Sequence, residues 1–331
     1  MQNINIGKSG IAVPFLGMGT WAIGGGAWWG DNDDALSVKA IQTAVEQGIQ
    51  WIDTAPIYGL YHSEEVVGEA MKHIDRDKVV LSTKCGLEWR HETPILHKVV
   101  DGVQVYRDLS AKSIIEDVED SLRRLHTDHL DVLYTHWQSP DFGVYPLEET
   151  MEAMMKLKEQ GKIRAIGASN VTSDIIRGYC KYGQLDVIQE KYSLLTRRIE
   201  KQLLPTCKEL GVSVQAYSPL EQGLLTGKGD HGHHLPGGQH PQHEPLLPAH
   251  PPGTGAGTAG KVGRSDREVR LHHGAAGHCH DRPHDPGAAR SVRCPQAGAG
   301  AGQRRCAAHQ AGRRRRRPHE VGRGRDLLKI N

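Results

Sequence analysis

The sequence predicts an α/β fold, a (β/α)8 barrel of the TIM-barrel type, and three observations support it. Short apolar runs alternate with longer amphipathic segments through residues 1–228. Successive apolar runs are spaced by roughly 30 residues, which suits βαβ units and a parallel sheet. Polar residues stand at or just beyond the ends of these runs, where such a barrel places its chemistry. We therefore expect one barrel over residues 1–228.

Each element can be assigned in order. Residues 2–14 predict a small hairpin, with its turn at Gly10. Seven strand candidates follow it: Phe15–Thr20, Gln50–Thr54, Val79–Lys84, Leu130–His136, Ala165–Ser169, Val187–Tyr192 and Val212–Tyr217. Between them lie helix candidates at residues 34–47, 63–73, 111–124, 147–159, 173–182 and 199–209. Only seven strands are recognisable, which predicts an incomplete barrel with two unpaired edges.

Helix 111–124 has both a capping residue and an amphipathic pattern. Ser110 precedes it as a capping residue, and Ile114, Val118 and Leu122 recur on one helical face. A doubly wound sheet is the competing topology, favoured by the glycine-rich stretch Gly17–Gly26. That stretch lacks a helix starting directly at it, so we interpret it as a loop at the mouth of the barrel.

The polar residues at the strand ends are candidates for chemistry. They are Asp53, Lys84, His136, Ser169 with Asn170, and Tyr217, while Gln189 lies within its strand. The carboxyl ends of parallel strands meet at one edge, so these side chains are predicted to lie close together. Any one of them could instead cap an element or be satisfied within the core.

Four of the residues predict proton transfer. A tyrosine hydroxyl ionises only near pH ~10, but a neighbouring ammonium stabilises its phenolate. Lys84 would supply that ammonium to Tyr58, and Asp53 would make the burial of Lys84 tolerable. His136 would donate a hydrogen bond to a substrate carbonyl. Taken singly, Tyr58 is also consistent with a rim tyrosine and His136 with a core histidine.

The composition changes abruptly near residue 228. Residues 229–325 contain no Ile, Phe, Tyr, Trp, Met or Asn, yet hold thirteen of the 20 histidines and ten of the 17 prolines. Such a segment has too few large apolar side chains to order itself, so we expect a disordered or misfolded C-terminal third. Codon-biased composition of this kind is typical of a GC-rich gene read out of frame. A frameshift is our hypothesis for residues 229–331, and a genuine low-complexity tail is the alternative.

The remaining global features set broad limits. The 331 residues carry a net charge of only +2 and include no apolar run long enough for a membrane span, and no signal peptide is recognisable. The six cysteines form no CxxC motif, which favours a reducing compartment, and a cytoplasmic location is the expectation. The arginine run 313–317 predicts only non-specific attraction to polyanions, with no specific nucleic-acid or membrane partner. No metal site is predicted.

Several segments of residues 4–228 together resemble the aldo-keto reductase family. They are FLGMGTWAIGG, WIDTAPIYG, SEEVVGEAM, LSTKCG, THW, GKIRAIGASN, IQEKYS and AYSPLEQGLLTGK, in the family's order and spacing. The resemblance implies a (β/α)8 barrel that uses NADP(H) or NAD(H) without a Rossmann domain. It implies reduction of an aldehyde or ketone to an alcohol, or the reverse, with a small carbonyl compound or sugar as substrate.

The resemblance also implies roles for individual residues. Tyr58 would be the general acid–base, Lys84 and Asp53 would tune it, and His136 would orient the substrate. The cofactor's carboxamide would be held by Ser169, Asn170 and Gln189, with Tyr217 stacked on the nicotinamide ring. Its pyrophosphate would be wrapped by Ser218, Leu220, Gly223, Leu225 and Gly227. The pocket for cofactor and substrate would be lined by Gly19, Thr20, Trp21 and Asp53. Its rim is expected to include the tryptophans Trp21, Trp28, Trp29, Trp89 and Trp137.

One departure from the family limits these expectations. The eighth strand and the segment that grips the adenosine end of the cofactor are not recognisable after residue 228. The preference between NADP and NAD therefore cannot be assigned, and the chain is predicted to fold poorly and to bind cofactor weakly or not at all. Besides an enzyme, two other functions stay open. They are a non-catalytic nicotinamide-binding barrel, such as a redox sensor or channel-type subunit, and a polyanion-binding protein acting through the basic tail.

Overall fold

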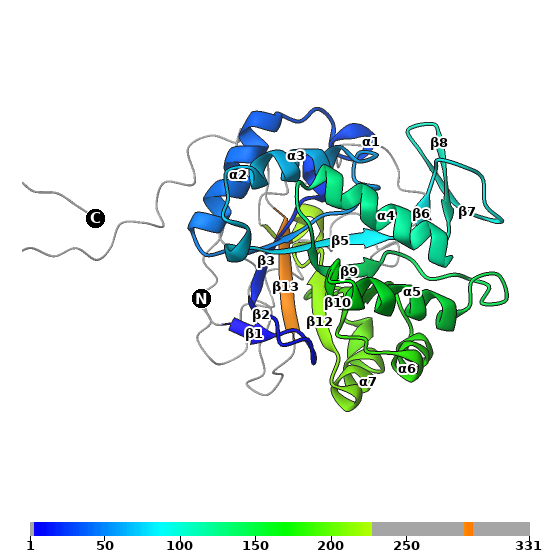
Figure 1. Ribbon diagram of the computed structural model, residues 1–331. Helices are drawn as coiled ribbons and strands as arrows, with labels where there is room; N and C mark the ends of the chain where they lie inside the picture. Colours follow the sequence, from blue (N-terminus) through cyan, green and yellow to red (C-terminus); the bar gives the residue numbers. More distant parts are fainter. Residues whose placement is uncertain (1–2, 227–287, 294–331) are drawn as a thin grey trace, which may run out of the picture. The chain divides into compact units, whose positions relative to one another are not determined.

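The computed structural model describes residues 3–226 and, as backbone, residues 288–293. Parallel strands form a closed barrel with helices outside it (Figure 1). The predicted barrel is thereby confirmed over a doubly wound sheet. Each of the seven predicted strands is present, with bounds within two residues of those expected. They are β3 (Leu16–Gly19), β4 (Trp51–Asp53), β5 (Val80–Cys85), β9 (Leu130–Thr135), β10 (Ile163–Ser169), β11 (Val187–Lys191) and β12 (Ser213–Tyr217).

An eighth strand, β13 (Ala288–Arg293), is the main departure from expectation. It lies between β12 and β3, with Arg290 opposite both Ala216 and Leu16. The expectation of a gap with two unpaired edges is therefore wrong. The sequence AARSVR has no apolar run, so hydrophobic pattern gives no signal for a strand. Its position follows instead from backbone groups on β12 and β3, which need partners whatever side chains their neighbour carries.

The six predicted helices are all present. They are α2 (Asp34–Glu46), α3 (His62–Met71), α4 (Ala111–Arg124), α5 (Leu147–Glu159), α6 (Ser173–Tyr182) and α7 (Leu203–Leu210). Ser110 caps α4 as predicted, since its hydroxyl accepts a hydrogen bond from the Ser113 backbone N–H at 3.3 Å. Gly211 ends α7 in the left-handed conformation, with φ of 72°. Shorter helical segments are α1 (Gly26–Trp29), η1 (Trp21–Gly24), η2 (Arg76–Lys78), η3 (Arg198–Glu200) and η4 (Glu221–Thr226).

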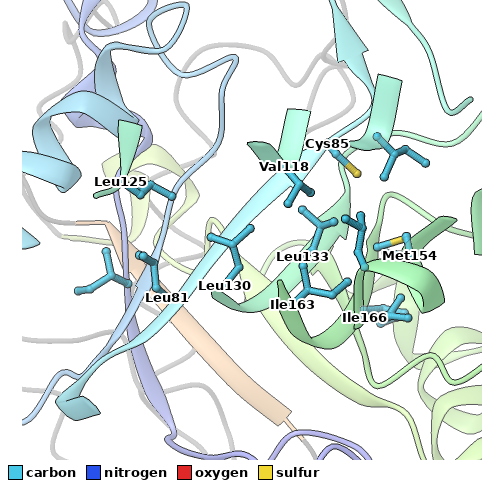
Figure 2. Close-up of a cluster of buried hydrophobic side chains, with 14 of the residues drawn as sticks. Leu81, Cys85, Val118, Leu125, Leu130, Leu133, Met154, Ile163 and Ile166 are labelled. Atoms are coloured by element: carbon cyan, nitrogen blue, oxygen red, sulfur yellow. The ribbon is translucent and has the colours of Figure 1, made fainter. Parts of the chain in front are cut away.

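The main core lies between the barrel and its outer helices (Figure 2). Val118 on α4 and Met154 on α5 are fully buried, against strand residues such as Leu133 and Ile166. Each such side chain contributes about 1.5–3 kcal/mol through removal of apolar surface from water. This layer fixes the strands, and with them the positions of the side chains at the strand ends.

A second apolar cluster closes the N-terminal end of the barrel. The predicted hairpin is present as β1 (Asn3–Asn5) and β2 (Ala12–Pro14), paired antiparallel. Around it, Ile6, Ile11 and Val13 pack in one buried cluster with Trp51 and Tyr134 from the barrel strands. We call this cluster the N-terminal plug. It leaves the opposite end of the barrel as the place for a site.

A small three-stranded sheet that the sequence assignment missed follows β5. It consists of β6 (Leu87–Glu88), β7 (Ile95–Val100) and β8 (Val103–Arg107), and in Figure 1 it stands beyond the end of β5. Asp101 and Gly102 join β7 to β8 with φ of 49° and 81°. Two positive φ values are typical of a type I′ turn, for which Asp-Gly is a favoured sequence. The signal was therefore present in the sequence.

Candidate active site

A buried ion pair lies at the C-terminal ends of β4 and β5. The Lys84 ammonium donates hydrogen bonds to Asp53 Oδ2 and to the backbone carbonyl of Thr54, both at 2.8 Å. Lys84 is 1% exposed and Asp53 is 4% exposed. β4 and β5 are neighbours in the sheet, and so the two residues meet as the strand order predicts. A buried lysine of this kind is tolerated because a carboxylate faces it.

Tyr58 lies on the loop after β4, beside this pair. Its ring centroid is 5.0 Å from Lys84 Nζ. Burial alone would lower the pKa of Lys84, but the charges and hydrogen bonds of Asp53 and Tyr58 outweigh that effect and raise it. Lys84 therefore stays an ammonium, held between a carboxylate and a phenol.

Two glycines allow the Tyr58 loop to reach this position. A Cβ on Gly59 would stand 2.1 Å from the carbonyl oxygen of Gly24, and Gly59 has a φ of 67°. A Cβ on Gly24 would likewise stand 2.6 Å from the carbonyl carbon of Tyr58. Any larger side chain at either position would push the two loops apart and displace the tyrosine.

His136 follows β9 and faces Tyr58, with 5.8 Å between the ring centroids and an edge-on arrangement. Its backbone is fixed on both sides, because its N–H donates to Cys85 and its carbonyl accepts from the Asn170 side chain, both at 2.9 Å. Burial, followed by the positive charges of Lys84 and Lys98, holds the pKa of His136 well below its ordinary value. A neutral imidazole can donate one hydrogen bond while accepting another. The structure thus brings the four predicted proton-transfer residues together.

A polar network inside the barrel holds the Asp53 carboxylate in place. Asp53 Oδ1 accepts hydrogen bonds from Ser82 Oγ at 2.8 Å and from Gln189 Nε2 at 3.1 Å. Gln189 Nε2 also donates to Gln215 Oε1 at 2.7 Å, and the Tyr134 hydroxyl donates to the same oxygen at 2.6 Å. The Gln189 amide therefore contacts Asp53 directly. Sequence reasoning found Gln189 but missed Ser82, Tyr134 and Gln215. The sequence of a strand alone does not show which of its polar residues point into the barrel and join this network.

Three predicted cofactor-binding residues meet at the ends of β10 and β12. Asn170, with φ of 58°, accepts a hydrogen bond from the Tyr217 hydroxyl at 2.9 Å. Ser169 is buried and donates to the backbone carbonyl of Gln189 at 2.8 Å. Tyr217 ends β12 and is half-buried, and its hydrogen bond to Asn170 fixes the position of its hydroxyl. An amide, a hydroxyl and an aromatic ring suit a flat heteroaromatic amide such as nicotinamide.

The loop after β12 has an unusual backbone. Four of its residues, Ser218, Glu221, Gln222 and Gly223, have φ between 47° and 106°. The Glu221 carboxylate anchors the loop, accepting from Lys191 Nζ at 2.9 Å and also from the Ser193 and Thr196 hydroxyls. Left-handed turns of this kind can direct successive backbone N–H groups at an anion, which suits a pyrophosphate. Leu220 and Leu225 lie partly buried in the same loop, and Gly227 lies outside the described residues.

The residues predicted to line the pocket differ in their environment. Gly19 ends β3. Thr20 is fully buried, and its hydroxyl bonds the Asp53 carbonyl at 3.0 Å and the Ser63 hydroxyl at 2.8 Å, so that it holds the scaffold together. The ring of Trp21 lies 6.2 Å from that of Tyr58 and 5.4 Å from those of Trp28 and Trp29.

The predicted tryptophan rim and the unpredicted small sheet meet above Tyr58. Tyr58 packs on a buried cluster that also holds Trp28, Trp89 and Trp137 beside residues of β6, β7 and β8. From β7, His97 lies against Trp137 and Lys98 lies over Trp28. Sequence reasoning missed both residues because it assigned no strand to this segment.

Other sequence features lie outside the site. The arginine run 313–317 and most of the segment 229–331 fall outside the described residues. In the part of the chain that the structure describes, no helix is long and apolar enough to cross a membrane.

Fold and site together define a class: a parallel barrel whose buried charged and polar residues gather at the C-terminal ends of its strands, where barrel enzymes carry their active sites. A sequence profile described as the Aldo/keto reductase family matches residues 15–261. The chain belongs to this family of oxidoreductases, whose members use NAD(P)H to reduce carbonyl compounds.

Individual relatives agree with the assignment. The chain is 50% identical over 228 residues to the NADH-specific methylglyoxal reductase of Escherichia coli strain K12, a match that covers 69% of this chain and 70% of the relative. The solved structure of glycerol dehydrogenase AKR11B4 from Gluconobacter oxydans is similar with a TM-score of 0.62 and 37% identity, covering 71% of this chain and 68% of that one. An aldo/keto reductase from Klebsiella pneumoniae, solved with NADP and acetate, has a TM-score of 0.55 and 32% identity, with 67% and 70% covered.

Proposed function

We propose that this chain reduces a small aldehyde or ketone to an alcohol, or catalyses the reverse, with Tyr58 as the proton donor. The observation that carries the proposal is the buried Lys84 ammonium, held by Asp53 and 5.0 Å from the Tyr58 ring. Bound nicotinamide cofactor would supply hydride to the carbonyl carbon. Tyr58 gives its proton to the carbonyl oxygen, and Lys84 stabilises the phenolate that remains.

The other residues have supporting roles in this proposal. Neutral His136 donates a hydrogen bond to the carbonyl oxygen and aligns it with the Tyr58 hydroxyl. Asp53 keeps Lys84 charged and in place, and Gln189 and Ser82 keep Asp53 in place. In the oxidation direction the same groups act in reverse, with the phenolate accepting the proton of the alcohol.

The cofactor would be held at the ends of β10–β12. Asn170, Ser169 and Gln189 provide the polar groups for the carboxamide, and Tyr217 provides a surface for the nicotinamide ring. The left-handed backbone of the loop after β12 supports a pyrophosphate position, over Ser218, Leu220, Gly223 and Leu225. Both NADH and NADPH are candidates, because similarity extends to an NADH-specific reductase and to a structure containing NADP.

A binding module without turnover is the competing function. Purified chain assayed with methylglyoxal and either NADH or NADPH distinguishes the two, by cofactor oxidation followed at 340 nm and cofactor binding followed by fluorescence. An enzyme of the proposed kind oxidises cofactor, and Tyr58→Phe reduces the turnover by about 10²–10⁴-fold while cofactor binding is kept. Binding without any turnover of a panel of small aldehydes would favour the module.

We propose further that residues 229–331 arise from a shifted reading frame and that cofactor binding is consequently weak. The match to the Escherichia coli relative covers 228 residues, which is 69% of this chain, so about a third of the chain lies outside that match. Contacts to the adenosine end of the cofactor would then be missing. Translating the gene in its other frames after codon 228 tests the first statement, and a titration of NADPH fluorescence tests the second. Tight NADPH binding together with a cooperative thermal melt would refute the second.

We infer a cytoplasmic location from the cysteines. Within the described residues Cys85, Cys180 and Cys207 are all free thiols, which is typical of a reducing compartment.

A further inference from the structure

In the β7–β8 hairpin beside the site, apolar side chains of β7 are exposed and polar side chains are partly buried, which is the reverse of the usual pattern. Along β7 the apolar side chains of Leu96 and Val99 are 55% and 59% exposed. Between them, His97 and Lys98 are half-buried toward the site. Large apolar residues are commonly the buried ones, and lysine is among the residues least often buried without a partner. Turning a lysine inward at the expense of two apolar residues costs stability, so the arrangement requires a reason.

A β-bulge produces this reversal. Leu96 lies opposite Tyr106 and Lys98 lies opposite Val105, so His97 is an extra residue with no counterpart on β8. Such a bulge breaks the strict alternation of side chains and redirects them. His97 thereby packs on Trp137 at 5.2 Å between ring centroids, and Lys98 Nζ lies 4.3 Å from the ring centroid of Trp28.

Lys98 has no counter-ion among the described residues 3–226. No carboxylate of this part of the chain lies within ion-pair distance of its ammonium, which instead lies over the face of Trp28. Burial lowers the pKa of Lys98 to about 8, so that most molecules keep the charge at pH 7. A partly desolvated ammonium with only an aromatic face beside it still has hydrogen-bond donors to offer.

Arg107 on β8 adds a second positive charge and fixes His97. Its guanidinium donates to the Gln138 carbonyl at 2.7 Å and to His97 Nδ1 at 3.2 Å. Because a guanidinium only donates, His97 Nδ1 must accept and Nε2 must carry the proton. Burial, together with Lys98 and Arg107, lowers the pKa of His97 to about 3, so the ring is neutral. No described residue accepts a hydrogen bond from Nε2.

These donors lie next to the proton-transfer residues. Trp28, under Lys98, is in edge-on contact with Trp21 at 5.4 Å, and Trp21 lies 6.2 Å from Tyr58. The charge of Lys98 also acts on His136, where it contributes to the lowered pKa. A molecule with its carbonyl at Tyr58 could therefore extend along the tryptophans toward Lys98.

We propose that Lys98, supported by His97 and Arg107, forms a subsite for the carboxylate of a carbonyl substrate. The substrate class is an oxo acid, an aldehyde or ketone with a carboxylate a few bonds from the reacting carbon. Its apolar middle would lie against Trp28 and Trp21, and its carbonyl oxygen would face Tyr58 and His136. This inference rests on the proposed reductase function for the placement of the carbonyl, whereas the carboxylate subsite can be tested by binding alone.

The test compares 4-carboxybenzaldehyde with its methyl ester, which differ in charge and little in shape. Binding is followed at pH 7 through tryptophan fluorescence of the full chain. We expect the carboxylate to bind at least about ten-fold more tightly than the ester. Lys98→Met abolishes the difference, and Lys98→Arg retains most of it. Lys78→Met serves as the control: it removes an exposed lysine at the end of η2, just before β5 begins, and should leave the difference in affinity unchanged.

Two results would overturn the subsite: equal affinity for the two compounds in the unaltered chain, or a carboxylate preference that survives Lys98→Met. A thermal melt gives an independent check on folding. Because Lys98 lacks a counter-ion among the described residues, we expect Lys98→Met to melt at the same or a higher temperature. Steady-state assays separate the two proposals: reduction of the ester and the acid with equal kcat/KM contradicts the subsite alone. A carboxylate preference in binding with no reduction of either compound contradicts the reductase function and leaves the subsite supported.

Discussion

The two ends of the barrel are built from different chemistry. At the N-terminal end, Ile6, Ile11 and Val13 form an apolar plug. At the C-terminal end, Asp53 and Lys84 are as deeply buried as the plug residues, yet both are charged. One end therefore stabilises the fold through the hydrophobic effect, whereas burying the charges at the other end costs stability, which the proposed proton transfer would explain. Substitutions at the two ends should separate stability from turnover.

The largest effect is expected at the charged end. Lys84→Met removes the ammonium beside Tyr58 and leaves Asp53 buried without its partner. We expect kcat to fall by about 10²–10⁴-fold and unfolding to become easier by about 3–5 kcal/mol. Cofactor oxidation at 340 nm and urea denaturation measure the two effects.

The double variant Lys84→Met with Asp53→Asn separates the two losses. Removing both charges should restore most of the stability, since no uncompensated ion is left, while activity stays low. Recovery of activity along with stability would mean that the ion pair acts only on folding.

The plug should give the opposite pattern. Ile6→Ala deletes a side chain that is 1% exposed, and we expect a loss of about 2–5 kcal/mol in the free energy of unfolding. Turnover per folded molecule should be unchanged at temperatures below the melt, because Ile6 lies beside the β1–β2 hairpin at the end of the barrel opposite Tyr58. A fall in the kcat of the folded variant by more than a few-fold would contradict the claim that the N-terminal plug acts on stability alone.

The smallest effect concerns pH at the charged end. The pKa of Lys98 is lowered to about 8 by burial, so the side chain is charged below pH 8 and neutral above it. Between pH 7 and 9 the KM for 4-carboxybenzaldehyde should rise by about ten-fold, and that for its methyl ester should not. The titratable groups near Lys98 do not contribute to this change in KM. The pKa values of His97 and His136 lie below the interval from pH 7 to 9, and Arg107 keeps its charge. A KM for the acid that is flat across the interval would exclude Lys98 as its partner.

The sequence predicted what depends on local pattern. Apolar runs predicted seven strands. Asp53, Lys84 and His136 at the ends of such runs predicted the candidate site, because strand ends converge in a barrel. β13 was not predictable in this way, since AARSVR has no apolar period and takes its place from neighbouring strands.

The β7–β8 hairpin shows a different limit. Its Asp-Gly turn was readable, but the bulge at His97 breaks the alternation from which buried faces are inferred. The inward position of Lys98 therefore required the structure. The contact of Gln189 with Asp53 likewise joins residues 136 positions apart in the chain, and no local pattern reports such a pair.

The central claim is that Tyr58, set by Lys84 and Asp53, delivers the proton. Single-turnover oxidation of NADH by saturating aldehyde tests it most directly, in ordinary and heavy water, with the unaltered chain and Tyr58→Phe. We predict that the unaltered chain reacts more slowly in heavy water, and that Tyr58→Phe reacts at least about 10²-fold more slowly with unchanged cofactor affinity. A Tyr58→Phe variant that oxidises NADH at the rate of the unaltered chain would contradict the account.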